Sequence, residues 1–314
     1  MGTIREPRIA GVVPAIITPF NEDLSIDTGT LERYAGWVAE ARIGALFCSG
    51  HAGEVASLSA RERKQVIEIV VSAAGDKPVI AGNYADSLED AIAQGRDAKA
   101  AGATALTIFP PPNIGAFGDD LIADDMVVNW HRAVTEGAEL PGVIFLYRRN
   151  SNSSYSREAL LRLAEMDSIV AIKEGSGLLT EYEANYRMLS QLDAPLPVLS
   201  TNNSWLLSSL AVGGDGIMSG AGSVIARQQV ELWEAVERED LAAARAVNDQ
   251  LYELNLAFYQ PQFIDMHSRM KVALTMLGII PRPNPRPPLL PISDAQQEQI
   301  RAGLVSAGLL EGSD

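Results

Sequence analysis

A short apolar segment followed by an amphipathic helical segment recurs along the chain, and this repetition limits the possible folds more than any other feature. About eight such units follow one another between residues 9 and 225. Strands that alternate with helices pair in parallel, and eight units in series are typical of a closed barrel rather than an open sheet. The dinucleotide-binding fingerprint of open sheets does not follow the first segment. The sequence therefore predicts an α/β fold, a (β/α)8 TIM barrel.

The predicted strands are apolar runs bounded by glycine, proline or charged residues. They cover residues 9–18, 44–48, 78–81, 104–109, 143–147, 169–173, 198–199 and 216–218. A residue able to cap a helix precedes several of the helical segments, and Ser59 with Glu62 three residues later forms a capping-box pattern. The other predicted caps are Asp27, Ser87 and Ser156.

The pattern changes from about Ala226 onward, where helical segments follow one another without strands. A proline-rich passage at 281–291 interrupts them and cannot join a helix, so we expect it to cross the surface before a last helix at 294–307. We predict that residues 1–225 form the barrel and catalytic domain. Residues 226–314 are predicted to form a C-terminal helical extension that packs on the barrel or on another subunit.

Composition limits the partners and the location of the chain. A formal net charge of −15 and a pI near 4.7 repel phosphate backbones and anionic lipid, so we expect no nucleic acid and no membrane partner. The single cysteine, Cys48, excludes an intrachain disulfide, and the three histidines have no metal-ligand spacing. The amino terminus lacks the apolar core of a signal peptide, so the expected location is the cytoplasm.

Lys173 ends the continuous apolar run that begins at Ile169. Such a run indicates a strand buried on both faces, and in a barrel the carboxyl ends of the strands form the catalytic face. A lysine on an apolar floor loses its proton easily and attacks carbonyl groups to form a Schiff base. Alone, the same residue would fit a solvated strand tip as well.

Other strand ends place mostly polar side chains on the same face. Tyr147 ends the fifth predicted strand and can serve as a proton shuttle beside an amine, or as a simple aromatic anchor. Gly50 and Gly53 bracket a tight turn whose backbone amides can hold a carboxylate. The whole predicted ring consists of Thr18, Ser49, Asn83, Phe109, Tyr147, Lys173, Thr201 and Ser219.

Five stretches together resemble the dihydrodipicolinate synthase and N-acetylneuraminate lyase family, in the family's order and over nearly the whole chain. They are residues 11–20, 50–54, 144–147, 172–177 and 213–217. The resemblance implies a barrel with a helical extension, a homo-oligomer (tetramer or dimer), and no metal or organic cofactor. It assigns the imine to Lys173, proton relay to Tyr147, and binding of the keto-acid carboxylate to Gly50, His51 and Ala52.

The chain also departs from the family pattern. Members that make dihydrodipicolinate usually carry two threonines in the turn, where this chain has His51 and Ala52, and a tyrosine pair where it has Pro111 and Pro112. Asn152 stands where an arginine would receive the second substrate's carboxylate. His51 is interpreted either as an acid or base, or as a helix-entry residue facing solvent.

Three further residues complete the predicted site. Arg148, or its neighbour Arg149, can receive a distal carboxylate or a hydroxylated chain, or can be a surface charge. Met218, at the end of the last predicted strand, is included among the substrate-binding residues with Arg148 and Asn152.

The leading hypothesis is a lyase that forms a lysine Schiff base with a pyruvate-type 2-oxo acid, for aldol cleavage, condensation or dehydration of a sugar-acid-like substrate. One competing hypothesis is 4-hydroxy-tetrahydrodipicolinate synthesis from pyruvate and aspartate semialdehyde. Another is a barrel that binds keto acids without turnover. A third treats residues 219–222, Ser-Gly-Ala-Gly, as a phosphate cradle.

Overall fold

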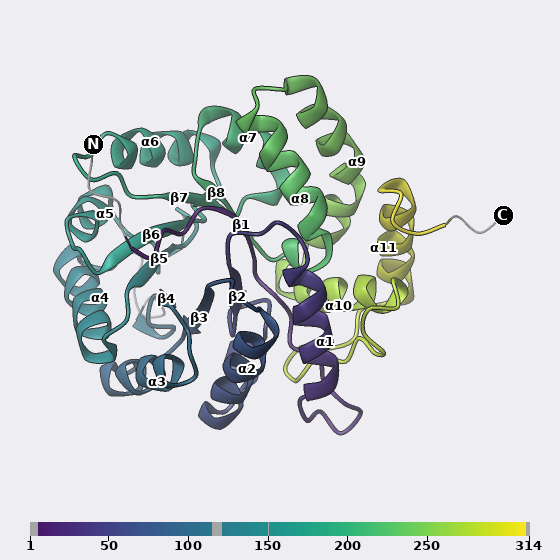
Figure 1. The fold of residues 1–314 in the computed structure, drawn as a ribbon, viewed down its shortest axis with the longest axis horizontal. Coiled ribbons are helices and arrows are strands. Elements are labelled where there is room, and N and C mark those ends of the chain that lie inside the picture. The colour runs from purple at the N-terminus through teal and green to yellow at the C-terminus, as the bar shows by residue number, and fades with distance from the viewer. Residues whose placement is uncertain (1–5, 115–120, 150, 312–314) are drawn as a thin grey trace.

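Eight parallel strands form the centre of the molecule, which is described from a computed structural model covering residues 6–114, 121–149 and 151–311. Each strand is followed by a helix, so the predicted (β/α)8 barrel is confirmed (Figure 1). The strands are Gly11–Pro14 (β1), Leu46–Cys48 (β2), Val79–Asn83 (β3), Ala105–Ile108 (β4), Gly142–Leu146 (β5), Ile169–Glu174 (β6), Val198–Ser200 (β7) and Gly216–Ser219 (β8).

The barrel closes between its first two strands. The hydrogen-bonded order runs β1-β8-β7-β6-β5-β4-β3-β2. Across the remaining seam, Ile16 N donates to Phe47 O at 2.9 Å and Gly44 N donates to Val12 O at 2.8 Å. These two hydrogen bonds pair backbone groups across the seam between β1 and β2, as burial in a core requires.

The first strand is shorter than the predicted 9–18. It pairs with β8 as far as Pro14, opposite Ser219. Beyond Pro14 the chain turns from β8 towards β2, where Ala15 bridges Phe47 in parallel. Proline has no N–H to continue a ladder, which makes a strand end at this position favourable.

Seven helices cover the barrel between successive strands, and an eighth follows β8. They are Thr28–Ala39 (α1), Ala60–Ala73 (α2), Leu88–Ala100 (α3), Asp124–Ala138 (α4), Arg157–Ala164 (α5), Leu179–Ser190 (α6), Leu206–Val212 (α7) and Gly222–Glu237 (α8). The predicted caps are confirmed: a side-chain oxygen of Asp27, Ser59, Ser87 or Ser156 accepts a backbone N–H in the first turn of its helix, and Ser59 forms the full capping box with Glu62.

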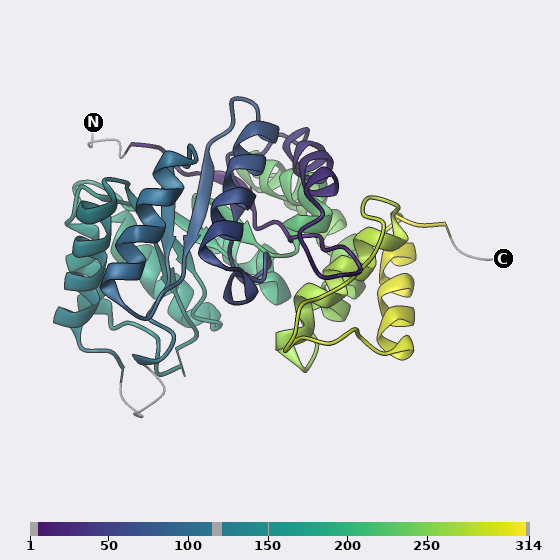
Figure 2. The same cartoon turned by 90° about the horizontal axis from the view of Figure 1, so that it is seen from below.

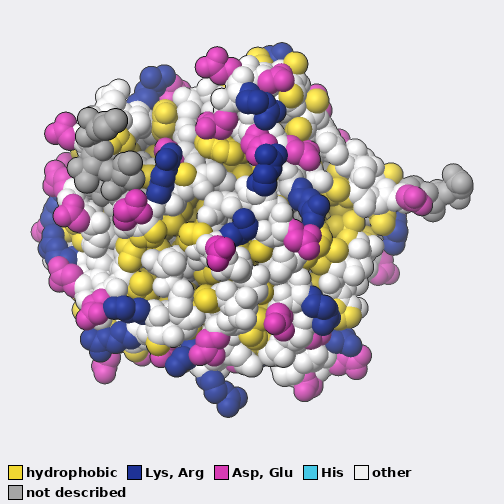
Figure 3. Space-filling model, viewed as in Figure 1, with side chains coloured by type: hydrophobic (Ala, Val, Ile, Leu, Met, Phe, Trp, Pro, Cys, Tyr) yellow, Lys and Arg dark blue, Asp and Glu magenta, His cyan; other side chains and the backbone are white. Residues whose placement is uncertain are grey.

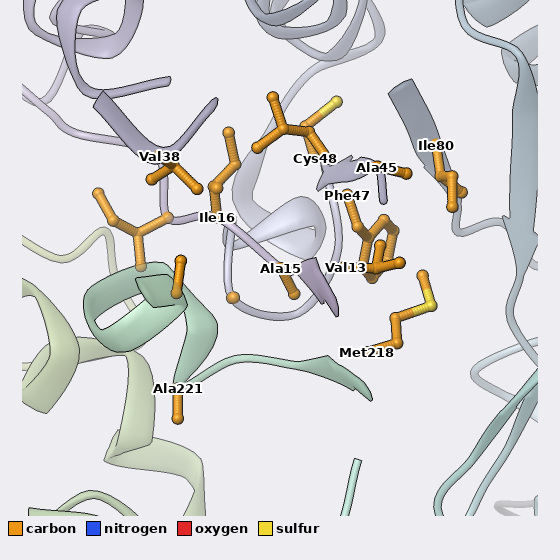
Figure 4. Close-up of a cluster of buried hydrophobic side chains, with 14 of the residues drawn as sticks. Val13, Ala15, Ile16, Val38, Ala45, Phe47, Cys48, Ile80, Met218 and Ala221 are labelled. Carbon is orange, nitrogen blue, oxygen red and sulfur yellow. The ribbon is translucent and has the colours of Figure 1, made fainter. Parts of the chain in front are cut away.

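The interior of the barrel is filled with apolar side chains from neighbouring strands. Figure 4 shows part of this core, including Val13 of β1, Phe47 of β2 and Met218 of β8. Val13 and Met218 are register partners, and neither side chain is exposed. Packing of this kind keeps the strand ends, and the residues attached to them, in fixed positions.

The C-terminal helices gather on one side of the barrel, outside the ring of α1 to α8 (Figures 1 and 2). They are Leu241–Tyr259 (α9), Met266–Met276 (α10) and Asp294–Ser306 (α11), the last beginning with a capping box at Ser293. A single 3₁₀ turn, Phe263–Asp265, joins α9 to α10. The division at 225 and 226 stays a prediction, and α8 runs across it with a bend at Ile225.

Charged side chains of both signs are interspersed with apolar ones over the face shown in Figure 3. Within the described part of the chain, no helix is long and apolar enough to cross a membrane.

Candidate active site

A cavity of about 530 Å³ opens at the carboxyl ends of the strands. Residues within β5 and β6, and residues that follow β1, β2, β5, β6, β7 and β8, contribute to its wall, as the barrel prediction expects. The lining residues on these loops and strands include Ala15, His51, Ala52, Phe145, Tyr147, Arg148, Lys173, Thr201 and Gly220. Predicted site residues far apart in the sequence therefore meet in one space.

Lys173 lies at the floor of this cavity, and its side chain is only 5% exposed. Phe145 of β5 is its register partner, and the lysine Nζ lies 4.0 Å from the centre of that ring and 5.1 Å from the ring of Phe47. Because this apolar surrounding disfavours the charged form, burial lowers the pKa of Lys173 to about 7. A large fraction of the amine is therefore neutral, and nucleophilic, near neutral pH.

Tyr147 and His51 form a hydrogen-bonded pair beside the lysine. The tyrosine hydroxyl and His51 Nε2 are 2.7 Å apart. Burial lowers the pKa of His51 to about 4, with a further contribution from the charge of Lys173, and burial raises the pKa of Tyr147. At neutral pH the imidazole is thus uncharged and the phenol protonated, a combination that can pass a proton in either direction.

The turn between β2 and α2 is fixed from several sides. Gly50 leaves no room for a side chain, since a Cβ there would lie 2.5 Å from Cζ of Phe47. Thr18 Oγ1 donates to Gly53 O at 2.9 Å, and Glu54 adopts a left-handed conformation with φ of 55°. The buried Glu54 carboxylate pairs with the buried Lys271 of α10. The turn is therefore held by the barrel and by the C-terminal extension together.

The remaining predicted residues are distributed differently. Arg148 lines the cavity and stacks its guanidinium 4.4 Å from the ring centre of Phe263. Arg149 lines a separate hollow with Glu181. Gly50, Asn152 and Met218 are not among the residues that line the cavity, and Met218 lies wholly in the core shown in Figure 4. Their assignment to substrate binding stays a prediction.

Sequence reasoning missed the part of the wall that the C-terminal extension supplies. Tyr259, Phe263, Met266 and His267 all line the cavity. They come from the end of α9, the 3₁₀ turn and the start of α10. The available signal was a cluster of aromatic and histidine side chains where one helical segment gives way to the next.

The amides of residues 221–224 do not support the competing hypothesis of a phosphate cradle at residues 219–222. Ala221 N donates to the Tyr259 hydroxyl at 2.9 Å, and Gly222 N donates to Ser219 Oγ at 3.4 Å. Ser223 N and Val224 N donate to carbonyl oxygens of Gly220 and Ala221. A phosphate needs free amides at a helix start, and these four are already paired. Among the described residues, no group of three or more His, Cys, Asp or Glu could hold a metal ion.

A buried amine on an apolar floor, at the carboxyl end of a barrel strand and in one cavity with a phenol, defines the class of barrel lyases that work through a lysine Schiff base. Comparison with known proteins narrows this class. The sequence model of the Dihydrodipicolinate synthetase family matches residues 8–307. The chain belongs to this family, whose members are class I aldolases and lyases.

Curated relatives and solved structures agree with that assignment. The 4-hydroxy-tetrahydrodipicolinate synthase of Methanothrix thermoacetophila is 32% identical over 307 residues, which cover 96% of this chain and 98% of the relative. That of Chloroherpeton thalassium is 30% identical, with 97% of each chain covered. The dihydrodipicolinate synthase of Acinetobacter baumannii, solved in complex with pyruvate, superposes with a TM-score of 0.86 at 26% identity, covering 96% of this chain and all of its own.

Proposed function

We propose that Lys173 forms a Schiff base with the ketone of a 2-oxo acid, and that pyruvate is this acid. The observation that carries the proposal is the position of the amine, which is buried on the rings of Phe145 and Phe47 and opens into the cavity that Tyr147 also lines. The pyruvate complex of the Acinetobacter baumannii relative supports the choice of 2-oxo acid.

The reaction begins when the neutral Lys173 amine attacks C2 of pyruvate. Amine, ketone and one proton yield a protonated imine and water. The imine withdraws electrons from C3, which loses a proton and becomes an enamine. Its C3 then bonds to the carbon of an aldehyde, whose oxygen takes up a proton, and water releases the 4-hydroxy-2-oxo acid from the lysine. Read backwards, the same steps are aldol cleavage.

Tyr147 and His51 are proposed to carry these protons. The tyrosine hydroxyl can protonate the departing oxygen while His51 Nε2, 2.7 Å away, accepts or returns the proton. The turn has no hydroxyl side chain at residues 51 and 52, where relatives resembling this chain usually have two. The imidazole thus takes the place of that relay.

The comparisons favour condensation with aspartate semialdehyde over the sugar-acid reaction preferred from sequence. The curated relatives at 30% and 32% identity are named 4-hydroxy-tetrahydrodipicolinate synthase. No finding specifically supports a sugar acid. The missing turn threonines, Pro111 with Pro112, and Asn152 separate this chain from the usual pattern of members that make dihydrodipicolinate. Asn152 concerns the second substrate, whereas the turn concerns the keto-acid carboxylate and the proton relay.

Reduction with borohydride in the presence of pyruvate tests the imine directly. We expect the chain to gain the mass of a reduced pyruvate adduct on a peptide containing Lys173, and Lys173→Met to gain none. Lys64→Met, in α2, serves as the matched control and should be labelled like the unaltered protein. A folded protein that gives no adduct on Lys173 contradicts the proposed function.

We further propose a homo-oligomer located in the cytoplasm. Support comes from the family resemblance and from the exposed apolar side chains Leu88, Ile114 and Met126, which line a groove beside α4. Light scattering coupled to size exclusion measures the mass in solution, and a mass of about 33.7 kDa would show a monomer and contradict this proposal.

A further inference from the structure

One fully buried arginine binds the backbone that joins α9 to α10. The side chain of Arg269 is 0% exposed, and the Asp265 carboxylate lies 3.9 Å from it. Its two terminal nitrogens donate to four carbonyl oxygens at 3.0, 2.9, 3.4 and 3.0 Å, which belong in turn to Phe258, Gln260, Pro261 and Gln262. The donors of a guanidinium are arranged as a fork that can bind several acceptors at once. Arg269 therefore fixes the path of the chain through this junction.

The same junction carries side chains that line the cavity. Tyr259 lies between the first two residues whose carbonyls Arg269 binds, and Phe263 follows the last of them. The centres of the Tyr259 and Phe263 rings are 5.8 Å apart. Arg269 itself is not among the residues that line the cavity. It can therefore affect a bound molecule only through the side chains that it holds in place.

The hydroxyl of Tyr259 is oriented by two hydrogen bonds that it accepts. Ala221 N and Asn203 Nδ2 each donate to it at 2.9 Å. The orientation of the Asn203 amide is fixed, because the same Nδ2 also donates to Thr201 O at 3.0 Å. The phenol oxygen thus serves as an acceptor twice, and none of the described residues accepts the proton of the hydroxyl itself.

This proton is available to a ligand. Gly220, which also lines the cavity, has no side chain to cover the phenol, and a Cβ there would lie 3.6 Å from the Tyr259 oxygen. Burial raises the pKa of Tyr259, so the hydroxyl stays protonated. The two N–H bonds that the oxygen accepts also polarise the O–H group and strengthen the bond that it donates. Tyr259 is therefore an oriented donor in the wall of the cavity.

We propose that Tyr259 donates its proton to an oxygen of the second substrate, and that Arg269 is the positioning residue that holds Tyr259 in place for this contact. The inference rests on the proposed function, in which the second substrate is an aldehyde that condenses with the pyruvate enamine. Both polar ends of pyruvate have other assigned partners, its ketone at Lys173 and its carboxylate at the turn after β2. Tyr259 is hydrogen-bonded instead to the loops after β7 and β8.

Separate measurement of the two half-reactions tests this role. Arg269→Lys keeps the charge but loses the fork that reaches four carbonyls. We expect it to lower kcat/KM for aspartate semialdehyde about tenfold and to leave borohydride trapping of pyruvate unchanged. Arg301→Lys makes the same change at an exposed arginine of α11, and this matched control should alter neither measurement. Equal losses of trapping and of condensation in Arg269→Lys would indicate a general structural defect and overturn the inference.

A double variant distinguishes positioning from an independent effect. Tyr259→Phe removes the donated hydrogen bond and should also lower kcat/KM for aspartate semialdehyde about tenfold. If Arg269 acts through Tyr259, the combination of Arg269→Lys and Tyr259→Phe should again lower it about tenfold. Independent sites would instead give a loss of roughly a hundredfold, and that result would contradict the positioning role.

Amide hydrogen exchange decides the inference without any aldehyde. In Arg269→Lys, exchange at the Ala221 amide and over residues 258–263 should be about tenfold faster than in the unaltered protein and in Arg301→Lys. If the unaltered protein gives no trapped pyruvate, the proposed function is overturned. Exchange that is unchanged in Arg269→Lys overturns only this inference.

Discussion

The neighbours of Lys173 make the charged form of its amine unfavourable. Burial lowers the pKa of this amine from 10.5 in water to about 7, so the protonated side chain destabilises the folded protein. Between these two values the unfolded chain holds a proton that the folded chain lacks. The free energy of unfolding therefore rises with pH across this window, and the contribution opposing folding is largest below pH 7.

Replacing the amine should consequently stabilise the protein while it abolishes the chemistry. We expect Lys173→Met to raise the free energy of unfolding by about 2 kcal/mol at pH 6.5, and this gain to shrink towards pH 10. Urea unfolding at several pH values measures it. Lys64→Met controls for the loss of a lysine elsewhere. A Lys173→Met protein less stable than the unaltered one at pH 6.5 would contradict the assigned environment of the amine.

At the scale of elements, the turn after β2 is tied to the C-terminal extension through buried charges. Lys271 of α10 pairs with Glu54 and donates to Asn284 O at 2.9 Å, while Arg286 N donates to the other Glu54 oxygen at 2.8 Å. The Arg286 side chain then bonds Glu62 of α2. The proline-rich passage thus reaches α2 and helps to hold the turn after β2.

Removing one partner of this buried pair should be costly. Lys271→Met leaves the Glu54 carboxylate buried without its counter-charge, and we expect a loss of about 3 kcal/mol in stability with a higher KM for pyruvate. The double variant Glu54→Gln with Lys271→Met should recover part of the stability. Lys99→Met, which breaks the exposed pair with Glu139, should cost less than about 1 kcal/mol. If Lys271→Met and Lys99→Met lower the melting temperature by similar amounts, the stabilising role of the buried Glu54–Lys271 pair is contradicted.

The sequence was informative where the signal is local. Caps such as Ser59 and the lysine at the end of β6 follow from short patterns, and the barrel makes strand ends neighbours. The contact between His51 and Tyr147 depends on side-chain directions across the barrel, which no local pattern specifies. Met218 was included because it ends a predicted strand, whereas the register with Val13 directs it into the core. Tyr259 and Phe263 reach the cavity only because the extension folds back on the barrel.

At the scale of the whole molecule, all three histidines resist protonation, and this predicts how the protein responds to acid. Burial lowers the pKa of His131 and of His51 to about 4 and that of His267 well below its usual value. The unfolded chain binds protons from about pH 6.5 downward, so stability present above pH 6.5 is lost as the pH falls towards 4. Each fully buried histidine contributes about 1.4 kcal/mol per pH unit in this window. The carboxyl groups of Glu174 and Asp215, whose pKa values burial raises, bind protons in the folded state and partly offset the loss.

Urea unfolding at pH 7, 6 and 5 should show a steep decline in the free energy of unfolding. His131→Gln, a substitution away from the cavity, should make this decline less steep by the contribution of one histidine. An unfolding free energy that does not change between pH 7 and 5 would contradict the buried, neutral state of these imidazoles.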